Sequence, residues 1–335
     1  MLGRSDVEDY AQPDRRKIES RYETIAAMTA LRFHLPQDRA IIAVGGEDRQ
    51  GFLQGLVSND TAKVSADGAI YAALLTAQGR FLFDLFIAEQ DGRYLVDCAA
   101  PRRADLIKRL SLYRLRSKVT IVDAETDWCG ALLFGDGAAA ALGLDGRAGA
   151  ATPFGGGVAY VDPRLPDLGV RLILPRATAR AQLAGLPASE DADGSAYHRR
   201  RIALGVPDAA RDLTPEKSIL LENGFDELNA IDWQKGCYMG QELTARTRYR
   251  GLVRKRLLPV RIEGTPPAPG TSLMLGEREI GEMRGVSADG TVGLAMVRLE
   301  ALAQGPSPTL SAGETRLSPD IPGWMRLPEL DEAKA

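Results

Sequence analysis

The chain has 335 residues, which is long enough for two or three domains with hydrophobic cores of their own. Its 44% hydrophobic and 26% charged residues are typical of a soluble globular protein. The net charge of −3 excludes a chain-wide positive field that would recruit nucleic acid, so any basic surface must be local.

The hydrophobic pattern predicts alternating strands and helices after a polar start. Residues 1–27 carry little apolar pattern, and we expect a flexible extension there. The next elements are predicted as strand 40–44, helix 48–56, strands 69–75, 80–88 and 93–98, and helix 101–112. Gln78-Gly79 is a short turn that joins two of these strands as an antiparallel hairpin.

A second block repeats this theme. Its predicted elements are strands 119–122, 131–134, 158–161 and 169–174, a small helix at 138–142 and a helix at 195–204. Beyond residue 251, short strands separated by Gly and Pro turns predict a small barrel or sandwich, at 252–263, 272–274, 279–286 and 291–297. The order of elements favours an α+β fold over a doubly wound sheet.

Targeting, membrane and metal signals are absent from the pattern. No apolar run approaches the roughly 18 residues of a membrane span, and the N-terminal residues are charged. Three widely separated cysteines make no CxxC pair, which favours a reducing, cytoplasmic setting. His34 has only Asp38 at a plausible ligand spacing and His198 is flanked by arginines, so we expect no metal site. Standard hydrolase, kinase and dehydrogenase motifs are also missing.

The most informative segment is Lys235-Gly236-Cys237-Tyr238-Met239-Gly240-Gln241-Glu242. Its two glycines permit a tight backbone path with positive φ, and residues 243–249 predict a helix. Cys237 would lie near the free N–H groups of a helix start, where positive charge favours the thiolate, and Lys235 would add a mobile cation. We therefore expect Cys237 to be a reactive thiol. The alternative is a small residue under a tight turn.

The other two cysteines have a different setting. Cys98 and Cys129 lie in strand-like segments, where a free cysteine behaves as a small hydrophobe. We expect both in the core.

Two basic clusters interrupt the balanced charge. The first has no acid within it and comprises Arg246, Arg248, Arg250, Arg254, Lys255 and Arg256. The second is His198-Arg199-Arg200-Arg201. Either could bind phosphates or a polyanion, and a solvated charged face is the alternative.

The cysteine segment, with Thr244-Ala245-Arg246 and Arg250-Gly251 after it, resembles the signature of the YgfZ-type folate-binding proteins. These are relatives of the glycine-cleavage aminomethyltransferase, GcvT. Phe52-Leu53-Gln54-Gly55, Ser58-Asn59-Asp60, Gly79-Arg80-Phe81-Leu82-Phe83-Asp84 and Tyr113-Arg114-Leu115-Arg116-Ser117-Lys118-Val119 resemble further parts of this family. The resemblance covers about residues 30–303.

The resemblance implies a GcvT-like folate-binding region of two α+β lobes and a C-terminal β-barrel. On this sequence the folate-binding region would be 28–250 and the barrel 251–328. One lobe would take about 28–117 with 190–250, and the other 118–189.

The implied role is that of an accessory protein for iron–sulfur cluster assembly or repair, including service to tRNA-thiolating enzymes. Tetrahydrofolate or a derivative is the implied ligand, with transient contact to an iron–sulfur cluster. The implied partners are iron–sulfur client or assembly proteins, folate, and tRNA or a tRNA-modifying enzyme. Cys237 is the residue on which the role would depend.

The family's site residues carry over position by position. Cys237, Lys235 and Asp84 would do chemistry, with Asp84 on the hairpin that carries a paired acid in the transferases. Folate contacts would come from Tyr197, Arg246, Arg250, Gln241, Glu242 and Asn59, with Tyr197 as a stacking surface. Ala203 stands where the transferases have a glutamate facing the pteridine, which argues against transferase turnover.

Two other functions stay open. One is tetrahydrofolate-dependent aminomethyl or one-carbon transfer, with Asp84 as general base or charge stabiliser. The other is an RNA-binding module that uses the arginines between 246 and 256, for which a steep salt dependence would be expected.

Overall fold

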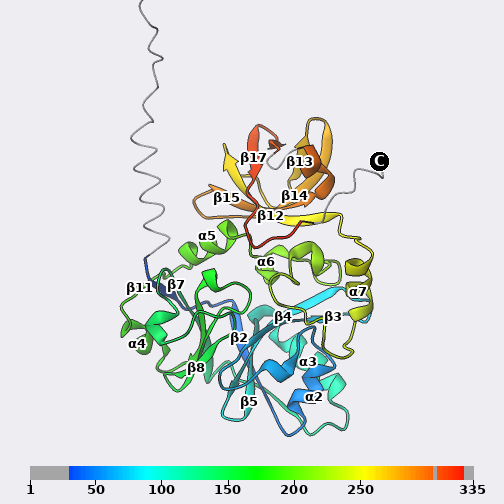
Figure 1. Ribbon diagram of the computed structural model, residues 1–335. Coiled ribbons are helices and arrows are strands. Elements are labelled where there is room, and N and C mark those ends of the chain that lie inside the picture. Colours follow the sequence, from blue (N-terminus) through cyan, green and yellow to red (C-terminus); the bar gives the residue numbers. More distant parts are fainter. Residues whose placement is uncertain (1–29, 305–307, 328–335) are drawn as a thin grey trace, which may run out of the picture.

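The computed structural model of the protein describes residues 30–304 and 308–327. The predicted flexible extension over residues 1–27 therefore lies outside the described residues. Figure 1 shows two sheets beneath a closed barrel, with helices α5 (Ser195–Ala203) and α6 (Ala209–Asp212) between them. The predicted α+β fold with a C-terminal β-barrel is confirmed.

The first sheet is antiparallel, and both of its faces are covered. In spatial order its strands are β3 (Ile70–Leu75), β4 (Phe81–Gln90), β5 (Arg93–Ala99), β2 (Arg39–Gly45) and β6 (Thr120–Asp123). Side chains alternate along β2, so Ile41 and Ala43 pack toward the second sheet, while Ile42 and Val44 pack under helices α2 (Arg49–Gln54) and α3 (Arg103–Arg114). Two buried faces explain why these strands read as continuous apolar runs in the sequence.

The second sheet has six strands. In spatial order they are β11 (Ser189–Glu190), β1 (Arg32–His34), β7 (Trp128–Phe134), β10 (Val170–Pro175), β9 (Gly157–Val161) and β8 (Ala151–Phe154). Only the β1–β11 pair is parallel among the pairings of this sheet. Helix α4 (Ala179–Ala184) covers its outer core, because Ala179 and Leu183 pack with Leu133, Val170 and Leu172.

The two sheets exchange a strand near the lobe boundary predicted at residue 117. Strand β1 comes early in the chain but pairs with β7 and β11 of the second sheet. Strand β6 comes after the boundary but pairs with β2 of the first sheet. Each of the two sheets therefore contains a strand from the part of the chain assigned to the other lobe. The lobe boundaries stay a prediction.

The remaining elements are short. The 3₁₀ turns are η1 (Thr61–Lys63), η2 (Ala100–Arg102), η3 (Ala140–Leu142), η4 (Pro166–Leu168), η5 (Leu221–Asn223) and η6 (Leu299–Gln304). The small helix predicted at 138–142 is thus the single turn η3. Helix α7 (Gln241–Tyr249) follows the cysteine segment, where a helix over 243–249 was predicted.

The barrel is a closed ring of six strands. In spatial order these are β12 (Lys255–Glu263), β15 (Val292–Arg298), β14 (Arg278–Val286), β13 (Ser272–Leu275), β16 (Leu310–Ala312) and β17 (Thr315–Pro319). Closure removes exposed strand edges, and Leu258, Met283 and Val297 fill its core. Across the described ranges, none of the helices is long and apolar enough to cross a membrane.

Candidate functional site

Cys237 is exposed, at the outside of a loop whose base is fixed. Before it, the Asp232 carboxylate accepts hydrogen bonds from the backbone N–H groups of Gln234 at 2.7 Å and Lys235 at 3.0 Å. This turn sets the direction in which the chain approaches the cysteine. The sulfur is therefore presented to solvent by a defined backbone.

The residues after Cys237 are also anchored. The Tyr238 N–H donates to Gln241 Oε1 at 3.1 Å, and the Tyr238 side chain is buried. The Met239 N–H donates to the Gly55 carbonyl, just beyond the end of α2, at 3.1 Å. Predicted folate contact Gln241 thus has a local structural role beside the thiol.

Lys235 does not provide the mobile cation that we expected beside Cys237. Its Nζ donates to the carbonyls of Gln54 at 2.8 Å, Val57 at 2.6 Å and Asn59 at 2.8 Å. Burial lowers the pKa of Lys235 to about 8. The ammonium satisfies three backbone acceptors at and just after the end of α2, and this is the physical reason that it is fixed rather than free.

The other two cysteines are protected. Cys98 is fully buried, and burial raises the pKa of its thiol to about 12. Cys129 is only half-buried, and burial raises its pKa as well. Cys237 is thus the exposed thiol among the three.

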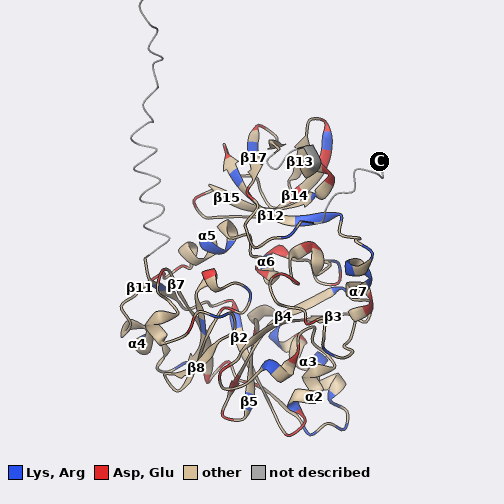
Figure 2. Cartoon of the chain, in the orientation of Figure 1, with Lys and Arg blue, Asp and Glu red and all other residues tan. Residues whose placement is uncertain are grey.

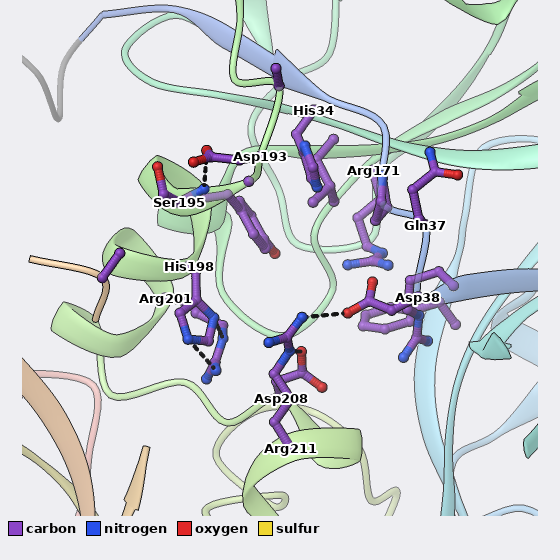
Figure 3. Close-up of a pocket in the computed structure, with 18 of the residues that line it drawn as sticks. His34, Gln37, Asp38, Arg171, Asp193, Ser195, His198, Arg201, Asp208 and Arg211 are labelled. Carbon is purple, nitrogen blue, oxygen red and sulfur yellow. Dashed lines mark hydrogen bonds and ion pairs between the residues drawn. The ribbon is translucent and has the colours of Figure 1, made fainter. Parts of the chain in front are cut away.

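A separate cavity of about 560 Å³ lies beside α5 and α6, where the two sheets meet (Figure 3). Its lining includes two of the predicted site residues, Asp84 from β4 and Tyr197 from α5. The other polar groups around it include His34, Gln37, Asp38, Arg39, Arg164, Arg171, Asp193, Ser195, His198, Arg201, Asp208 and Arg211. Such a volume and mixture suit a small polar ligand.

Buried ion pairs build the floor of this cavity. Arg39 donates from Nε to Asp97 Oδ1 at 2.7 Å and lies 3.3 Å from Asp84 Oδ2 through Nη1. Arg171 donates to Asp97 Oδ2 at 2.6 Å and stacks 3.6 Å from the Phe86 ring centroid. Burial alone would raise the pKa of Asp97, but the two arginine charges outweigh it and lower that pKa. Asp84 is therefore one member of a paired network.

Tyr197 forms part of the cavity wall. Its hydroxyl accepts a hydrogen bond from Arg164 Nη2 at 3.1 Å, and its ring packs edge-on against Phe134 with centroids 5.4 Å apart. Arg164 is in turn held by Asp162 at 2.8 Å. The ring is thus positioned before any ligand arrives, as a binding surface requires.

The histidine–arginine cluster on α5 is divided among internal partners. Arg201 is buried and pairs with Asp212 at 2.7 Å, while Arg199 pairs with Asp289 of the barrel at 2.5 Å. His198 faces the cavity and accepts from Arg201 Nε at 3.0 Å, and burial, followed by the Arg201 charge, lowers its pKa to about 4. This cluster braces the cavity wall and the barrel.

Figure 2 shows Lys and Arg gathered along α7 and at the start of β12. Arg246 pairs with Glu242 one turn earlier on the helix, and Arg248 stacks on Trp233 at 4.1 Å. Arg256 is buried against Glu227. Several of these arginines are therefore already occupied by the protein itself.

Most of the predicted folate contacts lie elsewhere. Asn59 is buried and donates to the carbonyls of Tyr71 and Asn229. The cavity lining does not include Lys235, Cys237, Gln241, Glu242, Arg246, Arg250 or Asn59. The structure thus separates two features that we had expected in one place, the cavity with Asp84 and Tyr197, and the loop with Cys237.

Three comparisons place the chain among known proteins. The model of the CAF17 C-terminal β-barrel domain matches residues 254–327, which form the barrel. The iron–sulfur cluster assembly factor IBA57 of Homo sapiens is 34% identical over 308 residues, which cover 85% of this chain and 83% of the human protein. This chain belongs to the IBA57 family of iron–sulfur cluster assembly factors. The resemblance to YgfZ-type proteins agrees with that membership.

Other relatives fit the same family. The IBA57 homolog of Mycosarcoma maydis is 35% identical over 244 residues, which cover 68% of this chain and 57% of that protein. The aminomethyltransferase of the glycine cleavage system from Bartonella henselae has the same fold, with a TM-score of 0.71, 17% identity, and coverage of 90% of this chain and 89% of that one. Both IBA57 relatives are named mitochondrial, so they do not confirm the predicted cytoplasmic location.

Proposed function

We propose that this chain serves iron–sulfur cluster assembly or repair through the exposed thiol of Cys237, with a reduced folate bound in the cavity beside α5. The observation that carries the proposal is the exposure of this one thiol on an anchored loop, in a chain whose other cysteines are protected. The clients proposed are iron–sulfur proteins, with tRNA-thiolating enzymes among them. The relatives are named as iron–sulfur cluster assembly factors, which supports this direction.

A single thiol limits what the chain can do with a cluster. Iron–sulfur clusters generally take about four protein ligands, and the described residues hold no group of three or more His, Cys, Asp or Glu side chains that could bind a metal. Cys237 would therefore act as one ligand, with the rest supplied by a partner, or would hold a persulfide in transit. Either task requires the solvent exposure that the loop provides.

The cavity fits a folate in chemistry as well as size. Pterin and glutamate groups present hydrogen-bond donors and carboxylates, and the lining offers acids and cations for them. Asp38 and Arg211 are paired with each other at 2.7 Å, so in this proposal the folate would share or replace that ion pair. Tyr197 supplies an aromatic surface. In this proposal Arg211 replaces Arg246 and Arg250 as the partner of the folate carboxylates, because it lines the cavity and they do not.

The structure weighs against the two alternatives. A general base for aminomethyl transfer needs a free carboxylate, and Asp84 is engaged by Arg39. An RNA-binding surface needs free cations, and three of the six basic residues of this cluster, Arg246, Arg248 and Arg256, are engaged by side chains of the chain, which leaves Arg250, Arg254 and Lys255 for such a surface.

Two measurements on the purified protein test the two halves of the proposal. Brief alkylation of the native protein with iodoacetamide should modify Cys237 first, and a digest showing Cys98 or Cys129 modified as fast would contradict the thiol half. Titration with tetrahydrofolate should saturate at one ligand per chain. Tyr197→Ala should weaken binding by about tenfold or more, whereas the exposed control Tyr249→Ala should not. Absence of saturable binding would remove the folate half.

A further inference from the structure

The end of α3 exposes an unusual amount of apolar surface. Three of the six large hydrophobic side chains that are exposed in the described chain lie here, namely Leu112 (68% exposed), Tyr113 (38%) and Leu115 (86%). Single exposed apolar side chains are common, but a local group of them marks an interaction surface.

The backbone at Leu115 is strained. The turn from Arg114 to Ser117 is closed by a hydrogen bond from the Ser117 N–H to the Arg114 carbonyl at 2.8 Å. Leu115 is its second residue, with φ 44° and ψ −112°, which is close to the first central position of a type II′ turn. Glycine takes this conformation without cost, and a bulky side chain does not.

No packing among the described residues offsets this strain, because the Leu115 side chain is exposed to solvent. The other non-glycine residues with positive φ in the described chain are Asp91, Glu216 and Asn229, all polar. Stability alone would therefore favour glycine at position 115. A leucine on an exposed, strained turn points to a contact made outside the chain.

The surroundings of Leu115 are basic. No acid occurs between Asp105 and Asp123 in the sequence. The same stretch contains five basic residues, Lys108, Arg109, Arg114, Arg116 and Lys118. Lys118 pairs with Glu47, whereas Arg114 and Arg116 are exposed and form no ion pair with described residues. Asp48, Leu115, Arg116 and Ser117 line an open depression of about 610 Å³. The Asp48 carboxylate accepts from the Lys118 N–H. The surface thus combines a projecting apolar side chain with two cations, Arg114 and Arg116, that form no ion pair with described residues.

The turn has a firm base. The Lys118 N–H donates to Asp48 Oδ2 at 2.7 Å, and Asp48 directly precedes α2. At its other end α2 is followed by Gly55, whose carbonyl accepts from the Met239 N–H of the cysteine loop. Since α2 has six residues, these two contacts are separated by only about 9 Å of helix.

We propose that Leu115 and its neighbours are the docking surface for a protein partner that presents an apolar pocket rimmed by carboxylates. Positive charge at the rim selects an acidic partner, and the projecting leucine requires a pocket of its own size. A nucleic acid backbone offers no apolar pocket for the leucine side chain. Through α2, the surface lies near the loop of Cys237. A docked protein that exchanges sulfur or a cluster at Cys237 would thus bind both in one complex, and this last step rests on the proposed function.

The first test compares Leu115→Gly with wild type in a strain that lacks the chromosomal gene. Because glycine suits the turn, the midpoint of thermal unfolding of the purified variant should rise. Rescue of iron–sulfur enzyme activity should nevertheless fall, by roughly tenfold if the leucine is an interface anchor. A stabilised variant with full rescue would overturn the proposal.

The second test identifies the partner by its chemistry. A photo-crosslinking p-benzoylphenylalanine at position 115 should give one dominant protein adduct, and the same group at exposed Glu277 on the β13–β14 turn should not. Reversing the charge with Arg114→Glu and Arg116→Glu should abolish the adduct, and lysines at the partner's cross-linked carboxylates should restore it. The proposal would be contradicted if this charge swap failed or if the adduct were with a second copy of this chain. It would also be contradicted if the chain co-sedimented with phosphatidylserine–phosphatidylcholine vesicles and Leu115→Gly abolished that co-sedimentation.

The Cys237→Ala variant separates this inference from the proposed function. Its adduct at position 115 should persist, because docking does not need the thiol. If Cys237→Ala loses rescue and Leu115→Gly keeps full rescue, only the docking proposal is contradicted. Loss of rescue in Leu115→Gly with full rescue in Cys237→Ala would sink the thiol mechanism and leave the docking surface standing.

Discussion

Gly79 and Gly240 lie against each other where the β3–β4 hairpin meets the start of α7. Both have φ 81°. A Cβ on Gly79 would lie 2.6 Å from the Gly240 carbonyl oxygen, and a Cβ on Gly240 would lie 3.0 Å from Gly79 Cα and 2.3 Å from the Thr76 carbonyl oxygen. Neither position admits a side chain, so these two glycines set how the cysteine loop rests on the first sheet.

Gly240→Ala should therefore destabilise the protein. The new methyl group meets backbone atoms that cannot move aside, and alanine disfavours positive φ, so we expect a loss of about 2–4 kcal/mol in the free energy of unfolding. Urea unfolding followed by circular dichroism measures it. Gly236→Ala is the matched control, because a Cβ there meets nothing within 4 Å. Equal stability of the two variants would refute the account of this contact.

Lys235→Met should weaken the base of the cysteine loop. It leaves the carbonyls of Gln54, Val57 and Asn59 without their shared donor, and we expect a loss of about 2–4 kcal/mol in the free energy of unfolding. Lys217→Met, at an exposed lysine, serves as the control and should change the stability by less than about 0.5 kcal/mol. A Lys235→Met variant as stable as this control would show that the three hydrogen bonds contribute nothing.

Asp226 should make stability depend on pH. Burial, and then the neighbouring Glu227 charge, raise the pKa of Asp226 from 3.8 to about 6. Between these values the folded chain keeps a proton that the unfolded chain releases, so this group's contribution to stability falls as pH rises through that window. Above about pH 6 the buried carboxylate bears its full desolvation cost.

Asp226→Asn removes this titration. The difference in unfolding free energy between variant and wild type should shift in favour of the variant by about 1–2 kcal/mol from pH about 4 to about 7. Urea unfolding of both proteins across this range measures the difference, and titrating groups that do not interact with Asp226 cancel in it. A difference that stays constant with pH would show that Asp226 titrates normally.

The strands, hairpins and α+β class followed from local patterns in the sequence, whereas the two lobes and the closed barrel were implied by the family resemblance. The hairpin at Gln78-Gly79 and the strands on either side were predicted because apolar runs and a turn glycine occur within a few residues. The reactive thiol was proposed at Cys237 in the same way, from the glycines beside it. Such features depend on neighbours in the chain.

The cavity could not be predicted in this manner. Arg39, Arg164 and Arg171 come from separate segments and meet around the single ring of Phe86. No residue spacing in the sequence predicts that these three side chains come together. Lys235 was misjudged for the same reason, because the carbonyls that hold it belong to residues some 180 positions earlier.

The most direct test of the central claim is the activity of an iron–sulfur enzyme in a strain that lacks the gene and carries Cys237→Ala at wild-type protein levels. Cys129→Ala is the control, because it removes a thiol but keeps the exposed one. The account predicts that Cys237→Ala restores little or no activity while Cys129→Ala restores nearly all of it. Equal restoration by the two variants would contradict a role for the Cys237 thiol in cluster assembly.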